Sequence, residues 1–391
     1  MPDYDHRFLV SLLHIFNILT ALSCTCSRCV RSLLILTPSQ KPHHRIPFGG
    51  LPMRAFSLFP KFPQIKAMRA LKATSLLLIS STALSSGAFA ADKVTLLTNW
   101  YAQAEHGGFY QAVATGIYQK YGLDVTIKMG GPQVNGIQLL AAHQADFILS
   151  YDFQVLSSAE AGIPVTTIAT SFQYDPQGLM THTDIAGLDG LKNKTILVAG
   201  NNMTSWWPWL KEKYGYSDAQ VRPYTFNLQP FFVNPDVAIQ AYPSSEPFQA
   251  EQAHTKTKFF LFADQGYPPY SATIVAMQDT LKSKPDVAAK FVKASMEGWK
   301  SYFNNPAPAN ALIKKENPQM TDAQLAFGVA QLKKLKLVTG GDAATQGIGV
   351  MTDARWKQTA DYMVRAKLLK PTTDYHKAYT LKFIKDTKVL P

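Results

Sequence analysis

Aromatic side chains are concentrated in five short segments of this 391-residue chain that are predicted to reach a common cleft. The segments are 99–110, 149–154, 170–175, 200–209 and 241–248, and together they contain thirteen aromatic residues, four acids and neither lysine nor arginine. A bare anion such as sulfonate or nitrate would need desolvated positive partners or several amides. A flat ring with N–H donors stacks on aromatic side chains and donates to carboxylates. The segments therefore favour a site for a heteroaromatic ring.

Trp100 and Glu246 are the first candidates for contact with such a ring. Trp100 follows the polar Asn99 at the end of a predicted strand, although an ordinary core tryptophan would give the same pattern. Glu246 precedes a proline that fixes the backbone, and the alternative for it is a surface helix cap, an effect of about 1 kcal/mol. We expect Trp100 and a partner such as Tyr151 or Trp206 to stack on the ring, while Glu246 accepts its N–H groups.

Two further features are each open to two interpretations. The segment 200–205 follows a predicted strand and either presents helix N-terminal amides to a polar ligand group or forms a plain capped turn. It lacks the Gly-Lys-Ser/Thr of a P-loop, so nucleotide hydrolysis is not supported. His106 either donates to the ligand or only caps the first helix. The predicted ligand-binding residues are Asn99, Trp100, His106, Tyr110, Tyr151, Phe172, Asn202, Thr204, Trp206, Tyr242 and Glu246.

The elements that must position these residues alternate between strand and helix. Strands are predicted over 94–98, 123–129, 145–150 and 164–170, with helices between them, and this cadence indicates βαβ units and a mostly parallel sheet. The pattern loosens around 176–184 and then restarts. The prediction is an α/β fold of two lobes joined by two hinge crossings, with 91–183 and 272–391 in lobe I and 184–271 in lobe II. Ligands of such sheets bind at the carboxyl ends of the strands, which face the cleft.

The first ninety residues differ from the rest of the chain. They carry ten lysines and arginines against two acids, so of the formal net charge of +12 only +4 belongs to 91–391, and a nucleic-acid partner is not expected. Residues 68–90 have the basic, apolar and Ala-Phe-Ala parts of a cleavable signal peptide, with cleavage before Ala91. We expect 1–67, which holds all three cysteines, to be a non-native or disordered upstream extension. Cysteine chemistry and thiolate metal sites are thereby excluded from 91–391.

The order of motifs along 95–310 resembles that of the NMT1/THI5-like (SsuA/ThiY-like) family, which contains periplasmic substrate-binding proteins of ABC importers. The stretch 116–125 resembles the family's "GFYKKEGLDV", and 245–248 resembles its "NEP" signature with Ser245 in place of the usual asparagine. Each match is weak by itself, but eight in order are strong. The matching segments are 99–100, 106–110, 116–125, 145–147, 162–165, 190–194, 245–248 and 285–299.

The resemblance implies the type 2 periplasmic binding protein fold and a function in uptake. A protein of this kind would bind a small heteroaromatic similar to a thiamine-pyrimidine precursor, of the hydroxymethylpyrimidine or formylaminopyrimidine class, and deliver it to an ABC permease in the inner membrane. It would be a periplasmic monomer without a cofactor or metal, and not an enzyme. The alternative ligands are taurine, an alkanesulfonate, nitrate or riboflavin. An enzyme like the yeast pyrimidine synthase is the other class, but that protein relies on a cysteine-rich iron motif, and 91–391 has no cysteine.

Overall fold

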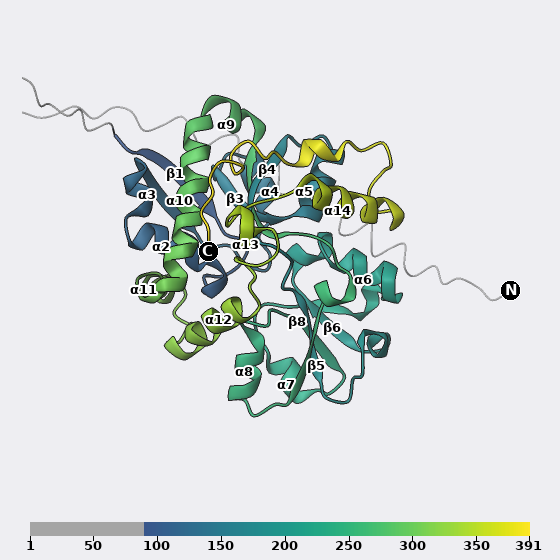
Figure 1. Ribbon diagram of the computed structural model, residues 1–391. Coiled ribbons are helices and arrows are strands. Elements are labelled where there is room, and N and C mark those ends of the chain that lie inside the picture. The colour runs from purple at the N-terminus through teal and green to yellow at the C-terminus, as the bar shows by residue number, and fades with distance from the viewer. Residues whose placement is uncertain (1–89) are drawn as a thin grey trace, which may run out of the picture. The chain divides into compact units, whose positions relative to one another are not determined.

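The computed structural model describes residues 90–391, which contain two five-stranded sheets with helices packed around them (Figure 1). Apart from Ala90, the predicted signal peptide and upstream extension lie outside these residues. None of the helices described is both long and apolar enough to cross a bilayer.

The first sheet has the strand order β2-β1-β3-β10-β4. β1 pairs in parallel with β2 and β3, while β10 runs antiparallel to both β3 and β4. Strands β3, β10 and β4 are continuous runs of buried residues because both faces of the sheet are covered there. The strands are β1 Asp92–Leu97, β2 Leu123–Lys128, β3 Phe147–Tyr151, β4 Val165–Phe172 and β10 Ser271–Met277.

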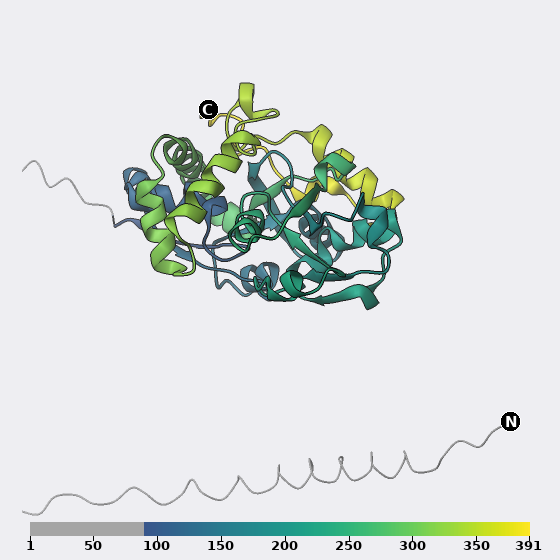
Figure 2. The ribbon, with the colours of Figure 1, turned by 90° about the horizontal axis from the view of Figure 1, so that it is seen from below.

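The second sheet repeats this plan with the order β7-β6-β8-β5-β9. β6 pairs in parallel with β7 and β8, and β5 runs antiparallel to β8 and β9. In Figures 1 and 2 the teal chain of this sheet lies on one side of the molecule and the blue strands of the first sheet on the other. The strands are β5 Gly178–His182, β6 Thr195–Val198, β7 Val221–Pro223, β8 Val237–Ala241 and β9 Thr257–Leu261.

The chain crosses between the two sheets twice, over 173–177 and over 262–270. The two crossings lie side by side: the Asp175 amide donates to the Pro269 carbonyl oxygen at 3.2 Å, and the Phe262 amide donates to the Gln177 carbonyl oxygen at 3.0 Å. β5 and β10 each start directly after a crossing, at the edge of the sheet that faces the other lobe. The parallel strands end at that edge, so β5 and β10 run antiparallel to them. The expected mostly parallel sheet is confirmed, with the refinement that each sheet contains one reversed strand.

The crossings also shift the predicted lobe boundaries. Residues 178–182 were assigned by sequence to the end of lobe I, at 183, but they form β5 between β8 and β9 of the second sheet. At the other boundary, β10 of the first sheet begins at Ser271, the last residue assigned to lobe II. From here on, lobe I denotes 90–172 with 271–391, and lobe II denotes 178–261.

Helices pack against both sheets. Among the described helices, the most extensive helix–helix contact is between α2, Gly107–Ala114, and α10, Pro285–Asn304. A Cβ atom on Gly107 or Gly108 would lie 2.1 Å from the Tyr302 ring or 2.3 Å from the Trp299 ring, so glycine is what lets these helices approach. The helical segment that follows β1 is divided at Gly116, whose φ of +70° separates α2 from α3. The helices are α2 Gly107–Ala114, α3 Ile117–Lys120, α4 Gly136–Ala141, α5 Asp152–Glu160, α6 Trp207–Tyr214, α7 Gln229–Val233, α8 Glu246–Gln252, α9 Gln278–Ser283, α10 Pro285–Asn304, α11 Ala307–Glu316, α12 Asp322–Lys334, α13 Ala343–Gln346 and α14 Asp353–Arg365.

Candidate functional site

A small cavity lies between the two lobes, at the carboxyl ends of β1, β3, β4 and β8. Its volume is about 40 Å³, room for about three water molecules. Two carboxyl groups, one imidazole and several amides line it, and neither lysine nor arginine does so among the residues described. We call it the ring cavity; its walls are Asn99, Trp100, Gln103, Glu105, His106, Tyr151, Phe172, Gln177, Asn202, Gln240, Ala241, Tyr242, Ser245, Glu246 and Ala272.

A hydrogen-bonded chain of uncharged groups forms the lobe I wall of the ring cavity. The side-chain amide of Asn99 donates from Nδ2 to the Tyr151 hydroxyl at 2.7 Å, and its Oδ1 lies 3.1 Å from Nε2 of His106. His106 occupies the N-cap position of α2, but its side chain makes no capping bond, so the capping interpretation was wrong. Burial lowers the pKa of His106 to about 4, which keeps the imidazole neutral near pH 7.

Glu246 is the first residue of α8, and its carboxyl group faces inward rather than toward solvent. One oxygen accepts from the Tyr224 hydroxyl at 2.8 Å and the other from the Tyr242 amide at 2.9 Å. Burial raises the pKa of Glu246 to about 7, although both of these hydrogen bonds act in the opposite direction. A carboxylate offers about four acceptor positions, so each oxygen keeps room for one further donor.

A second buried carboxyl group, Glu105, lies on the lobe I side of the same cavity. Burial raises its pKa, and the Ser244 hydroxyl of lobe II donates to it. Beside this contact the Ser245 hydroxyl donates to Gln103 Oε1 at 2.7 Å. These two bonds join the lobes directly, so both carboxyl groups of the site lie at the surface where the lobes meet.

Trp100 offers one aromatic face to the cavity, because the other is already covered. Its ring stacks on Tyr224 with 6.2 Å between the centroids and 16° between the planes, and it meets Tyr101 edge-on. Trp100 is only half-buried. The same Tyr224 therefore supports the aromatic wall and the Glu246 carboxylate.

Eight of the eleven predicted binding residues line the ring cavity, and three do not. Tyr110 is buried in the lobe I core, where α2 packs on α10. Trp206 is fully buried among the aromatic side chains of lobe II, where its indole N–H donates to Gln177. Thr204 lines a neighbouring cavity instead. The residues that line the ring cavity are Asn99, Trp100, His106, Tyr151, Phe172, Asn202, Tyr242 and Glu246.

The segment 200–205 does not begin a long helix. Residues Gly200–Thr204 form a short 3-10 helix, and α6 starts only at Trp207, with no side-chain cap at its start. Asn202 instead donates from its side chain to Gln240 at 3.0 Å. The same Gln240 oxygen accepts from the Ala199 amide at 2.6 Å, which fixes the loop to the end of β8.

Sequence reasoning missed the amide side chains of the site, namely Gln103, Gln177 and Gln240, together with Glu105 and Ser245. Glu105 was counted among the acids of the cleft segments but was not chosen. A usable signal was present for Gln240, a lone polar residue within the apolar run of β8. Such a buried amide needs hydrogen-bond partners, which marks it as a positioning group.

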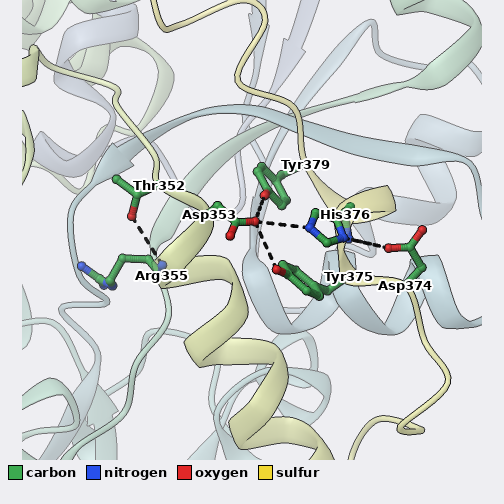
Figure 3. Close-up of polar contacts among 7 residues, drawn as sticks. All are labelled: Thr352, Asp353, Arg355, Asp374, Tyr375, His376 and Tyr379. Carbon is green, nitrogen blue, oxygen red and sulfur yellow. Dashed lines mark hydrogen bonds and ion pairs between the residues drawn. The ribbon is translucent and has the colours of Figure 1, made fainter.

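Arg355, near the start of α14, ties the two crossings together. One guanidinium nitrogen donates to the carbonyl oxygens of Gln173 and Pro268, both at 3.0 Å, and the guanidinium lies over the Tyr270 ring at 4.4 Å. Figure 3 shows the start of α14, with Thr352 as its cap and the exposed Asp353 held by side chains of the C-terminal segment. Arg355 thus holds both crossings to lobe I, together with bonds such as the one that the Tyr174 hydroxyl donates to the Leu335 carbonyl oxygen.

Comparison with known proteins gives three related findings. A family model described as "NMT1/THI5 like" matches residues 103–309, more than half of the chain. The chain is 26% identical to riboflavin-binding protein RibY of Chloroflexus aurantiacus over 75% of this chain and 86% of that one. It is 25% identical to the formylaminopyrimidine-binding protein of Halalkalibacterium halodurans, over 58% of this chain and 72% of that one.

The fold is shared with solved periplasmic binding proteins. The alkanesulfonate-binding protein SsuA from Xanthomonas axonopodis pv. citri superimposes with a TM-score of 0.55 at 13% identity, over 74% of this chain and 99% of that one. The expected family and fold are confirmed, and the two lobes around a buried cavity agree with them. The chain belongs to the NMT1/THI5-like family and is a solute-binding protein of the ABC-import type.

Proposed function

We propose that this protein is the periplasmic solute-binding component of an ABC importer and that it captures a small aminopyrimidine of the thiamine-precursor class. It would hand this ligand to a permease in the inner membrane. The observation that carries the ligand class is the pair of buried carboxyl groups, Glu105 and Glu246, facing an aromatic-walled cavity without a basic side chain among the described lining residues. A ring with N–H groups would donate hydrogen bonds to these buried carboxylates, and those bonds would stabilise the complex.

Each wall has a role in this proposal. Trp100 stacks on the ring with its uncovered face, and Tyr151, Phe172 and Tyr242 enclose the edge. Glu246 accepts the N–H groups, and Asn99, oriented by its bonds to Tyr151 and His106, offers a neutral hydrogen-bonding partner. Because the cavity holds only a few waters in the closed form, the lobes must part to admit a ring and close again over it.

Riboflavin is the second candidate, favoured by the long match to the riboflavin-binding relative. Its uracil-like edge has one N–H donor between two carbonyl oxygens, so two facing carboxylates would oppose the carbonyls. Sulfonates and nitrate fit less well, since neither lysine nor arginine lines the described cavity and two buried carboxyl groups would repel the anion.

Native mass spectrometry of protein purified from the periplasm of its own cells tests the proposal directly. We expect a co-purified mass in the aminopyrimidine range, and calorimetry should then show tight binding of hydroxymethylpyrimidine or formylaminopyrimidine. Tight binding of taurine or nitrate that does not change in Glu246→Gln would contradict the ligand class and leave the transport role standing.

A further inference from the structure

A second, larger cavity opens beside the ring cavity. Its volume is about 480 Å³, and it shares Asn99 and Tyr151 with the ring cavity as common walls. Lobe I contributes the segment 133–138 and one side of α5, and lobe II contributes the short helix around 200–204. Several of the lining residues are exposed, so this cavity reaches the surface. We call it the arm cavity.

The walls of the arm cavity are uncharged and combine apolar side chains with amides and hydroxyls. Among the described residues that line it there is no aspartate, glutamate, lysine, arginine or histidine. One wall atom also lacks a partner: Asn201 Oδ1 is buried without a hydrogen bond, while its amide donates to the Asn99 carbonyl oxygen at 3.2 Å. The side chains that give the cavity its hydrogen-bonding character are Gln133, Asn135, Gln138, Gln154, Asn201 and Thr204.

The arm cavity is completed by lobe closure. Gln154 of lobe I donates to the Asn201 carbonyl oxygen at 2.9 Å and to the Thr204 hydroxyl at 3.3 Å, both in lobe II. Gly200 permits this approach, since a Cβ atom there would lie 2.6 Å from Gln133 Oε1. A group held in this cavity would therefore contact both lobes in the closed form.

We infer that the arm cavity receives an uncharged arm of the ligand, bearing hydroxyl or amide groups and attached to the ring held beside Trp100. The inference rests on the proposed function and narrows it to unphosphorylated compounds. Hydroxyls and amides both donate and accept, which matches the amides and hydroxyls placed among the apolar side chains of these walls. A phosphate would carry its charge into a cavity without a cationic wall and next to two buried carboxyl groups.

Calorimetry on compounds that differ only in the arm tests the inference. The pyrimidine series is 4-amino-2-methylpyrimidine, which has no arm, then hydroxymethylpyrimidine, formylaminopyrimidine and hydroxymethylpyrimidine phosphate. The flavin series is lumiflavin, which carries a methyl group in place of the arm, then riboflavin and riboflavin phosphate. We expect each hydrogen bond gained by an arm to tighten binding about three- to tenfold, and the phosphates to bind at least about tenfold more weakly than their alcohols.

A charge placed in the arm cavity gives the sharper test. Gln138→Lys puts an ammonium on the exposed wall of this cavity, and Gln144→Lys adds the same charge at an exposed position that lines neither cavity. We expect Gln138→Lys to reduce the ratio of the affinity for the alcohol to the affinity for its phosphate by about tenfold or more. Gln144→Lys should leave this ratio unchanged.

The possible outcomes separate this inference from the proposed function. If armed and bare rings bind equally, or if Gln138→Lys and Gln144→Lys behave alike toward the phosphates, the arm cavity is not a ligand subsite and the ring site stands. If no pyrimidine or flavin binds at all, the proposed function fails and the inference fails with it.

Discussion

The protonation of Glu246 should control ligand affinity near neutral pH. Burial raises the pKa of this carboxyl group to about 7. A ligand that donates N–H groups to it needs the ionised form, so binding lowers the pKa and becomes weaker as the pH falls. The full affinity is thus present above pH 7 and is lost progressively below it.

The magnitude follows from the ionised fraction. If only the carboxylate binds, the apparent affinity scales with the fraction ionised in the free protein, which falls from about nine-tenths at pH 8 to about one-hundredth at pH 5. We therefore expect the affinity to decrease by about a hundredfold over this interval. Glu246→Gln should mimic the protonated form: about ten- to a hundredfold weaker than the native protein at pH 8, and nearly constant down to pH 5.

Isothermal titration calorimetry between pH 5 and pH 8 measures the affinity as a function of pH. The pKa of the free ligand is determined separately in solution, so that protonation of its ring can be subtracted. Repeating the calorimetry in buffers of different ionisation enthalpy at pH 6 should show about one proton released per ligand bound. Tyr224→Phe removes the hydrogen bond that lowers the pKa of Glu246 but keeps the ring under Trp100. We expect its profile to keep the same shape with a midpoint above that of the native protein.

Other acids near the cavity could produce a similar profile, and matched variants distinguish them. Asp175, in the first crossing, has a pKa raised by burial to about 7, and burial also raises the pKa of Glu105. His106 does not titrate in this interval, because its pKa is about 4. Asp175→Asn should retain the native profile. If Glu246→Gln still loses affinity below pH 7, or if the native protein shows no pH dependence, the reasoning is refuted.

Three further outcomes are expected. Trp100→Ala should weaken binding about tenfold or more with little change in the melting temperature, since this side chain is only half-buried; an equal loss in Trp100→Phe would contradict stacking. Arg355→Lys should lose the forked contact to Gln173 and Pro268, destabilise the hinge by about 1–3 kcal/mol, and give a larger ligand-free radius of gyration in small-angle scattering. The pKa of Asp152 is raised by burial to about 8, so native stability should fall as the pH rises from about 4 to 8, and Asp152→Asn should flatten that fall in thermal unfolding.

The sequence predicted strands best where they have a regular local pattern, either a continuous apolar run such as β3 and β4 or the alternation of β2. The four early strands were placed within a few residues, because β-branched runs between turn residues leave little ambiguity. β5 and β8 were missed for different reasons. β5 follows a proline and begins at Gly178, so it reads as a turn, and only its pairing with β8 and β9 makes it a strand. β8 is interrupted by Gln240, whose amide is needed to hold the 200–204 loop.

The same distinction explains which site residues were found. Asn99, Trp100, Tyr151, Phe172 and Tyr242 all end or follow a strand, and the carboxyl ends of the strands meet at the cleft whatever the details of packing. Trp206 lies after a short 3-10 helix, where no period fixes the direction of a side chain, and it turns into the aromatic core. The lobe II loops are thus the part of the site that only tertiary packing determines.

The direct bonds between the lobes place a condition on any ligand. In the closed form Ser245 donates to Gln103, Gln324 of α12 donates to the Ser245 carbonyl oxygen at 3.0 Å, and Gln154 reaches across to Asn201. These contacts stabilise closure without a ligand, so a ligand shifts the equilibrium only by its preference for the closed over the open form. Aromatic stacking on Trp100 alone, a wall that belongs to lobe I, would bind equally well to either form. If the proposed function is right, closure is driven by a ring that contacts both lobes at once, stacking on Trp100 of lobe I while donating to Glu246 of lobe II.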